Sequence, residues 1–419
     1  MKRISLHNII RAVNGTLVGE AKTLQGYVKR VVTDSRIVKA GDLYIPIIGE
    51  RFDGHDFIKQ AFEEGAVLAF TSEIVQEAGL KGCLIQVEDT RIALGRLAAY
   101  YRSLFELPII GITGSVGKTS TKEMMASILE RGFKVHKTLG NYNNDIGLPL
   151  TVLGIEPSHE VAVIELGMNH FGEIDYLANI LKPTIGLISN IGVSHIEFLG
   201  SKEGILKAKC EMIPHIATGG TLVLNGDDDL LVIIKERHGA KSMFYGRNQR
   251  FDCTMINHQL VNDQQKMTVA TKNNIYNIKV DYPGFHMLHN ALGCMLIGEQ
   301  LGLSKEAITI GVQSYKPAGM RLNTYHLSNG ITLIDDAYNA SVDSMESALK
   351  TLSDMKSNYN YNVAVLGSMF EMGNYAKRGH MDVGVMASKY GLDVLITVGK
   401  EAKWICEGAL KAGMPQSHM

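Results

Sequence analysis

Residues 111–122 read GITGSVGKTSTK and follow the apolar run PII at 108–110. An apolar strand that enters a glycine-rich turn and then a helix points backbone N–H groups at a phosphate. The common phosphate-loop pattern G-x-x-x-x-G-K-[ST] is broken here, because Ile112 stands where its first glycine should be, and the shorter form T-G-x-x-G-K-T remains. The stretch therefore predicts a strand, a phosphate-binding loop and a helix beginning near Lys118, which commits this region to an α/β fold.

Three further apolar runs support a mostly parallel sheet around this loop. They are VAVIEL (161–166), TIGLISNI (184–191) and TLVLN (221–225), and near-continuous apolar strands are typical of parallel sheets buried on both faces. Residues 250–282 instead alternate polar and apolar side chains, which predicts a small antiparallel patch.

The chain of 419 residues is too long for one ordinary core. Short strand-like and helical runs in the first hundred residues indicate a small α/β unit, and the pattern restarts after the linker KPAG with ITLIDDA (331–337), NVAVLG (362–367) and DVLITVG (393–399). We therefore predict three α/β domains at 1–107, 108–318 and 319–419.

Composition argues against a charged macromolecular partner. Lys and Arg number 42 against 43 Asp and Glu, so the formal net charge of −1 encodes no broad attraction to nucleic acid or anionic membrane. No run approaches the roughly twenty apolar residues of a spanning helix, and the five cysteines form no C-x-x-C pair. We expect a soluble, cytoplasmic protein without membrane insertion, and a monomer.

The loop residues carry the first chemical prediction. Gly114 and Gly117 would let the backbone approach a phosphate, Lys118 would neutralise its charge, and the Thr119 hydroxyl would bind Mg²⁺. A plain strand-to-helix turn is the alternative. The predicted ATP-binding residues of the loop are Gly114, Ser115, Val116, Gly117, Lys118, Thr119 and Ser120.

Two polar residues at predicted strand ends are candidate metal ligands. Glu165 ends VAVIE, and His195 follows TIGLISNI, at the edge where ligands gather in parallel sheets. A solvated acid or a structural histidine is the ordinary alternative for each.

Several motifs then occur in one order along nearly the whole chain. They are TDSR (33–36), GERFDGHDF (49–57), TGSVGKT (113–119), NYNNDIGLP (141–149), ELGMNHFGEI (165–174), NIGVSHIEFLGS (190–201), KAKCEM (207–212), LNGDDD (224–229) and DDAYNASVDSM (335–345). In this combination the chain resembles the Mur ligase family. The resemblance implies an N-terminal domain for a UDP-sugar, a central phosphate-loop ATPase domain with a mostly parallel sheet and a C-terminal Rossmann-like domain.

The resemblance also implies roles for single residues. Lys118, Lys209, His195 and Asn144 would be catalytic. Asn290 would lie near adenine, with Arg321 and Asp336 reaching the nucleotide from the third domain. Ser35 and Arg36 would contact the uridine diphosphate, and Asn143 and Asn144 would line the reaction centre. The implied cofactors are ATP and two Mg²⁺ ions, held by Thr119, Glu165, His195 and Lys209 as its CO₂-derived carbamate. Neighbouring Lys207 is the alternative carbamate.

Within the family, the motifs NYNNDIGLP and DDAYNA are similar to those of the members that join D-alanyl-D-alanine to UDP-N-acetylmuramoyl-tripeptide through an acyl phosphate. This resemblance implies a role in cytoplasmic peptidoglycan precursor synthesis, and hence in cell-wall biogenesis, cell shape and cell division. Two alternatives stay open: a relative that adds the third amino acid, or a nucleotide- and UDP-sugar-binding protein with impaired ligation. The second arises because family members continue past DVLITVG with more strand and helix, so we expect the third domain to lack its last β/α unit. Lysine and diaminopimelate both remain candidates for the third residue of the acceptor peptide.

Overall fold

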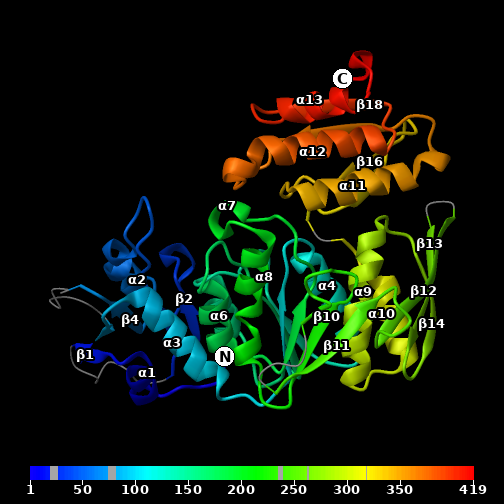
Figure 1. Ribbon diagram of the computed structural model, residues 1–419. Coiled ribbons are helices and arrows are strands. Elements are labelled where there is room, and N and C mark those ends of the chain that lie inside the picture. The colour runs from blue at the N-terminus through cyan, green and yellow to red at the C-terminus, as the bar shows by residue number, and fades with distance from the viewer. Residues whose placement is uncertain (19–26, 74–81, 235–238, 262–263, 318) are drawn as a thin grey trace.

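The computed structural model describes residues 1–18, 27–73, 82–234, 239–261, 264–317 and 319–419. Figure 1 shows three groups of strands and helices that follow one another along the chain. The fold is α/β in three domains with a mostly parallel central sheet, as predicted. The boundaries at 107 and 318 stay predictions, and residue 318 lies outside the described residues.

The N-terminal group is built on a five-stranded sheet in the order β1-β5-β4-β3-β2, in which only β1 runs antiparallel to its neighbour. The strands are β1 (Thr16–Val18), β2 (Arg30–Val32), β3 (Asp42–Tyr44), β4 (Leu68–Thr71) and β5 (Cys83–Gln86). The helices are α1 (Leu6–Val13), α2 (Ile58–Glu63) and α3 (Thr90–Arg102).

Helix α3 joins this group to the central one. The side chain of Asp89 caps its first turn by accepting a hydrogen bond from the N–H of Ile92 at 2.9 Å. At the other end the buried hydroxyl of Tyr101 donates to the carbonyl oxygen of Ile155 at 2.6 Å. One apolar core runs continuously through both groups, so the N-terminal group is packed firmly against the central sheet.

The central sheet has nine strands in the order β14-β13-β12-β11-β10-β9-β6-β8-β7. Its parallel strands are β6 (Ile109–Thr113), β7 (Val135–Lys137), β8 (Val161–Glu165), β9 (Ile185–Ile188), β10 (Thr221–Asn225) and β11 (Lys241–Gly246). The predicted antiparallel patch is confirmed as β12 (Cys253–Val261), β13 (Gln264–Thr271) and β14 (Ile275–Val280), which extend the same sheet.

Helices cover both faces of this sheet, which explains its apolar strands. Along β10, Leu222 and Leu224 enter the core shared with the N-terminal group, whereas Val223 enters a second core on the opposite face. The helices on the first face are α5 (Gly147–Leu153), α6 (Glu173–Leu181) and α8 (Lys202–Cys210), and those on the second are α4 (Lys118–Leu129), α9 (Phe285–Gln300) and α10 (Lys305–Ser314).

The third group contains two small sheets. Strands β15 (Asn323–His326) and β16 (Thr332–Asp335) form an antiparallel pair, and β17 (Val363–Gly367) and β18 (Val394–Val398) form a parallel pair. The run at 331–337, expected to begin the third α/β unit, thus lies in the antiparallel pair. The helices are α11 (Val342–Asp354), α12 (Ala376–Lys389) and α13 (Lys403–Lys411).

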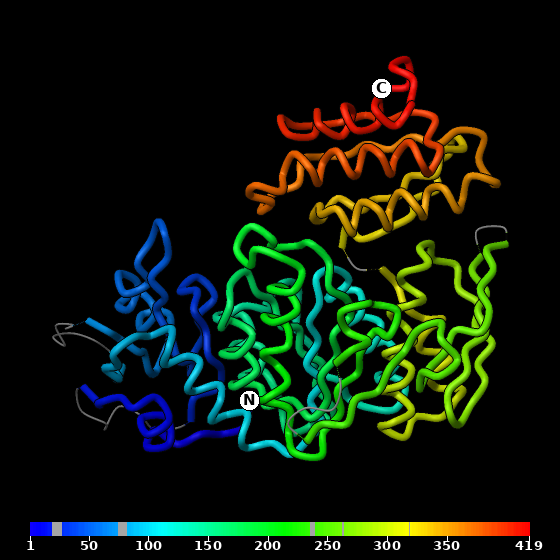
Figure 2. Tube along the Cα trace, viewed as in Figure 1, coloured from blue at the N-terminus to red at the C-terminus, as the bar shows by residue number. Residues whose placement is uncertain are grey.

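The third group packs its helices on one face of β17 and β18. Ala364, Leu366 and Leu395 are buried there, whereas Val365 and Val398 on the other face are exposed. The Cα trace in Figure 2 shows this group set against the edge of the central domain at which residues 190–200 lie. Across the described parts of the chain, no helix combines the length and the apolar character needed to cross a membrane.

Candidate active site

A cavity of about 1100 Å³ lies where the central domain meets the third group. It is bordered by the loop after β6, the carboxyl end of β8, the segment after β9 and the start of α11. Most of the residues predicted from the sequence line it together: Ser115, Val116, Gly117, Lys118, Thr119, Ser120, Asn143, Glu165, His195, Asn290, Arg321 and Asp336.

The loop after β6 has the geometry that its glycines predict. Gly117 caps α4 with φ of 79°, a left-handed conformation that favours glycine, and a Cβ there would meet Nδ2 of Asn290 at 2.8 Å. The segment after β9 holds the loop in place. The N–H of Ser115 donates to the carbonyl oxygen of Asn190 at 3.1 Å, and the hydroxyl of Ser115 accepts from the N–H of Gly192 at 2.9 Å.

Lys118 is the first residue of α4, and its Nζ donates to the carbonyl oxygens of Gly114 at 2.9 Å and Ser115 at 3.3 Å. Burial lowers the pKa of Lys118, the negative charge of Glu165 opposes this, and the guanidinium of Arg321 adds to it. A cationic group enclosed with few counter-charges is suited to an anion such as a phosphate.

Glu165 is the last residue of β8, as predicted, and its side chain is buried. Its Oε1 accepts a hydrogen bond from Nδ2 of Asn143 at 2.8 Å, and its Oε2 has no partner among the described residues. A buried, unpaired carboxylate oxygen at a cavity is costly unless a cation or a donor binds it. Together with the hydroxyl of Thr119, it offers the hard oxygen ligands that Mg²⁺ prefers.

His195 does not lie at the end of a strand. β9 ends at Ile188, and His195 caps the short helix α7 (Ile196–Leu199) with a left-handed φ of 64°. The sequence suggested a strand end because the apolar run continues to Ile191, beyond the last paired residue. Nδ1 of His195 lies 2.7 Å from Oε2 of Glu371 in the third group. Burial and the charge of Lys118 lower the pKa of His195, and Glu371 opposes them.

Lys209 is buried in α8 and is not among the residues that line the cavity. Burial, reinforced by the charge of Lys118, holds the pKa of Lys209 well below its usual value. Within the described residues its amine makes no hydrogen bond or ion pair. Lys207, two residues earlier, is exposed and lies 5.6 Å from the ring centre of Phe171.

The third group supplies two of the predicted nucleotide residues. The guanidinium of Arg321 stacks 4.1 Å from the ring centre of Tyr338. The carboxylate of Asp336 accepts from the N–H of Leu322 at 3.2 Å. Burial raises the pKa of Asp336 to about 6, against the opposing effects of the Leu322 N–H and of Arg321.

Other predicted residues do not line this cavity. The side chain of Asn144 accepts hydrogen bonds from the N–H groups of Ile146 and Gly147 and thereby braces the start of α5. Ser35 is buried in the N-terminal group, and neighbouring Arg36 is paired with Asp34 at 2.7 Å. Gly114 and Lys209 are not among the lining residues either.

Sequence reasoning missed three residues that shape the site. Asn190 and Asp343 stood inside quoted motifs, so their positions were visible but their contacts were not. Glu371 lies after β17, in a segment that contains none of the motifs. Its role in the site is indicated only by its proximity to His195 in the folded protein.

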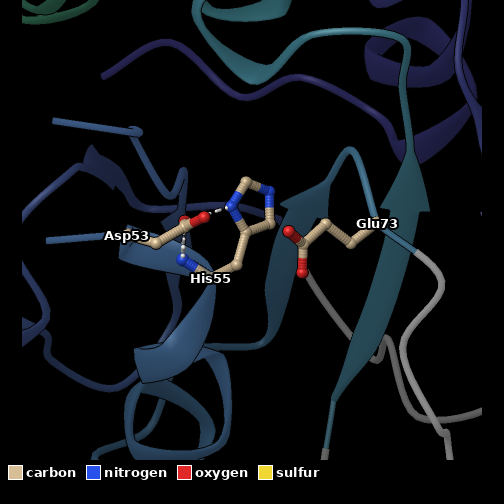
Figure 3. A group of neighbouring side chains, drawn as sticks. All are labelled: Asp53, His55 and Glu73. Atoms are coloured by element: carbon tan, nitrogen blue, oxygen red, sulfur yellow. Dashed lines mark hydrogen bonds and ion pairs between the residues drawn. The ribbon is translucent and has the colours of Figure 1, made fainter.

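A separate cluster of Asp53, His55 and Glu73 lies in the N-terminal group (Figure 3). Nδ1 of His55 is 2.6 Å from Asp53, and its Nε2 accepts from the N–H of Ser72 at 3.1 Å. Figure 3 shows the Glu73 carboxylate beside the imidazole, with no hydrogen bond or ion pair drawn between them. Both ring nitrogens are thus engaged by the protein, which identifies His55 as a brace between two loops.

Three family models match consecutive parts of the chain: "Mur ligase family, catalytic domain" at 27–102, "Mur ligase middle domain" at 112–298 and "Mur ligase, glutamate ligase domain" at 320–418. The UDP-N-acetylmuramoyl-tripeptide–D-alanyl-D-alanine ligase of Bacillus subtilis is 37% identical over 98% of this chain and 88% of its own length. The same-named ligase of Escherichia coli is 34% identical, over 96% of this chain and 87% of its own.

Solved structures agree with these matches. A crystal structure of MurF from Acinetobacter baumannii has a TM-score of 0.90 and 32% identity, covering 98% of this chain and 89% of its own. MurF from Thermotoga maritima in complex with ADP has a TM-score of 0.81 and 27% identity, covering 90% and 86%. The order of motifs, the three-domain fold and these matches over nearly the whole chain establish that the protein belongs to the Mur ligase family.

Proposed function

We propose that the protein is an ATP-dependent ligase that joins D-alanyl-D-alanine to UDP-N-acetylmuramoyl-tripeptide. The observation that carries the proposal is the single cavity into which the phosphate loop, Glu165, His195 and the third-domain residues Arg321 and Asp336 all project. The names of relatives that match almost the whole chain support this choice of substrates. We further propose that it works in the cytoplasm, as a monomer.

In the first step, a carboxylate oxygen of the peptide attacks the γ-phosphorus of ATP, and the bond between this phosphorus and the β,γ-bridging oxygen breaks. ADP departs, and the peptide carries an acyl phosphate. In the second, the amine of D-alanyl-D-alanine attacks the acyl carbon, loses a proton and expels phosphate. Neither step needs a protein nucleophile. Lys118 and the N–H groups at the start of α4 would neutralise the charge on the transferring phosphoryl group, which is the main demand of this chemistry.

The residues at the cavity fit a magnesium site. Glu165 has a buried oxygen with no partner among the described residues, and Thr119 lines the same wall. We propose that these two residues, His195 and Lys209 in carbamate form hold two Mg²⁺ ions. When bound, the ions supply positive charge at the phosphate oxygens. Asn143 would orient Glu165 through its hydrogen bond to Oε1.

Lys209 is proposed to carry the carbamate. Its neutral nitrogen would form a bond to the carbon of CO₂ and lose a proton, which turns an amine into an anionic oxygen ligand. Burial favours the neutral amine that this reaction requires, because the pKa of Lys209 lies well below its usual value. Exposed Lys207 lacks that environment, which favours Lys209 over it.

The N-terminal domain is proposed to hold the UDP part of the acceptor through Ser35 and Arg36, with Asn144 beside the reaction centre. Arg36 is available for this role, since 82% of its side chain is exposed and its partner is a surface carboxylate. Asn290 would lie beside adenine.

A coupled phosphate-release assay tests the proposal. Purified protein with ATP, Mg²⁺ and UDP-N-acetylmuramoyl-tripeptide should release phosphate rapidly only when D-alanyl-D-alanine is added, and mass spectrometry should detect the pentapeptide product. A panel of lysine and diaminopimelate acceptors would decide the third residue. Ligation of a single amino acid to a dipeptide acceptor would instead identify the relative that adds the third residue, and binding without product would identify a binding protein.

A further inference from the structure

The segment 190–197 connects the phosphate loop to the third domain. On the loop side, the carbonyl oxygen of Asn190 accepts from the N–H of Ser115, and the N–H of Gly192 donates to the hydroxyl of Ser115. The next residues of the segment contact the third domain. We call residues 190–197 the docking segment.

Two contacts seat the docking segment in the third domain. The N–H of Val193 donates to Oδ2 of Asp343, at the start of α11, across 2.8 Å, and the Val193 side chain is buried in the core of the third domain. A Cβ at Gly192 would clash with the same carboxylate oxygen, so a larger residue there would have to displace the Asp343 side chain. The docking segment therefore packs closely against Asp343.

A third contact involves the candidate metal ligand. Oε2 of Glu371 lies 2.7 Å from Nδ1 of His195, and 18% of the His195 side chain is exposed. This is an ion-pair distance, and the buried Nδ1 atom has no hydrogen-bond partner of good geometry among the described residues, so Glu371 is the group placed to engage it. Glu371 adopts a left-handed φ of 59°, which is uncommon for a residue other than glycine, asparagine or aspartate. Gly373 packs against Glu197 at the other end of the docking segment. The backbone of the third domain is thus shaped to bring the Glu371 carboxylate to this nitrogen.

We propose that Glu371 is a positioning residue, whose carboxylate beside Nδ1 of His195 keeps the proton on that nitrogen and holds the ring when the third domain is docked. This leaves Nε2 of His195 with its lone pair free for the cavity. The inference rests on the proposed function for the role of His195. It adds that the third domain completes the site by fixing the orientation and tautomer of a side chain that belongs to the central domain.

The physical reason lies in how imidazole ligands are held. A ring whose Nδ1–H is bound by a carboxylate presents its other nitrogen in one tautomer and one orientation, and losing such a partner typically weakens metal affinity or activity by about 10- to 100-fold. An ordinary exposed ion pair would instead be worth almost nothing. Glu371 is half-exposed, but its partner His195 is largely enclosed, so their contact differs from an ordinary exposed ion pair.

Two variants of Glu371 separate these cases. Glu371→Gln keeps an oxygen acceptor, and Glu371→Met removes it. Both keep an unbranched side chain, so the backbone cost of the left-handed φ stays similar. Glu407→Met, on the exposed face of α13 and away from the cavity, is the matched control.

The first measurement needs neither metal nor nucleotide. Long-range ¹H–¹⁵N spectra of protein labelled in its histidines, with His195 assigned by His195→Gln, should give one Nδ1–H tautomer for the wild type, Glu371→Gln and Glu407→Met. Glu371→Met should give a mixture. The second measurement titrates MnCl₂ into the ADP-bound protein by electron paramagnetic resonance, where Glu371→Met should weaken binding about tenfold or more and Glu371→Gln by less than about threefold.

The inference is overturned if Glu371→Met matches the wild type in both measurements, or if Glu371→Gln is as impaired as Glu371→Met. A different cause would be that Glu371 only holds the third domain against the central one. Hydrogen exchange of the amides of residues 190–197 tests this, because in that case Glu371→Met would raise the exchange as much as Asp343→Ala does. A wild-type protein that fails to ligate would refute the proposed function, whereas the tautomer measurement would still decide the role of Glu371.

Discussion

Nδ2 of Asn143 donates a hydrogen bond to Oε1 of Glu165 across 2.8 Å, so the Asn143 side chain determines which carboxylate oxygen remains free. The free atom, Oε2, is buried and has no partner among the described residues. One residue from the segment after β7 thereby sets the orientation of the acid that ends β8.

Replacing Asn143 by leucine should weaken the Mg²⁺ dependence of ligation. The carboxylate of Glu165 would lose its partner at Oε1 and rotate, and the loss of such a supporting contact typically costs about 10- to 100-fold. The apparent Mg²⁺ affinity from initial rates measures this. Asn277→Leu, on an exposed position of β14 in the same sheet, is the control and should behave as the wild type. Equal Mg²⁺ dependence in the two variants would remove Asn143 from the site.

Lys118→Ala should abolish most ATP-dependent ligation with little change in stability. Among the described residues, the amine donates only to carbonyl oxygens of its own loop, so we expect little loss of stability. Losing one charge-stabilising donor, by contrast, costs about 3 to 4 kcal/mol in the transition state. Steady-state rates and thermal melts check both parts. Lys305, which likewise begins a helix but is exposed, provides the control Lys305→Ala. A Lys118→Ala protein with near-normal turnover would exclude the loop from the mechanism.

Lys209→Ala should lose most activity and regain part of it when a short free carboxylate such as acetate is added, because the carboxylate can replace the proposed carbamate. Lys207→Ala should remain nearly unaffected, since that side chain is exposed. In protein equilibrated with ¹³C-bicarbonate, a carbamate ¹³C signal should be present in the wild type and absent from Lys209→Ala. Normal ligation by Lys209→Ala, or the signal persisting in it, would contradict the assignment.

The pKa of Asp336 predicts a pH dependence of stability. Its folded pKa of about 6 lies above the ordinary value of 3.8, so the folded protein holds this proton more tightly than the unfolded chain does. Protonated Asp336 therefore contributes fully to the free energy of unfolding below pH 3.8. This contribution, on the order of 3 kcal/mol, is lost as the pH rises to about 6.

Urea unfolding between pH 4 and pH 7.5 tests this, with the fluorescence of Trp404, the sole tryptophan, as a probe in the third domain. The stability of the wild type relative to Asp336→Asn should fall across this range. Asp354→Asn, at the exposed end of α11, should follow the wild type. Parallel curves for the wild type and Asp336→Asn would show that the carboxyl is not buried in solution.

The sequence alone determined the features that depend on neighbouring residues. Apolar runs specified strands buried on both faces, and β10 satisfies this by sending Leu222 and Val223 into opposite cores. Gly117 and Lys118 specified a loop that opens a helix, because a left-handed residue followed by helix formers is a local property. Motif order then indicated the family, and most of the residues predicted for the site line the cavity.

The tertiary structure decided what depends on segments far apart in the chain. No local pattern encodes that Glu371 would reach His195, because that distance depends on how the third domain sits on the central one. The same holds for Asn144: its motif is visible in the sequence, but only the folded chain shows that its side chain forms hydrogen bonds to the start of α5. Short polar side chains accept from whichever N–H groups the folded backbone brings near, so their partners are known only when the packing is complete.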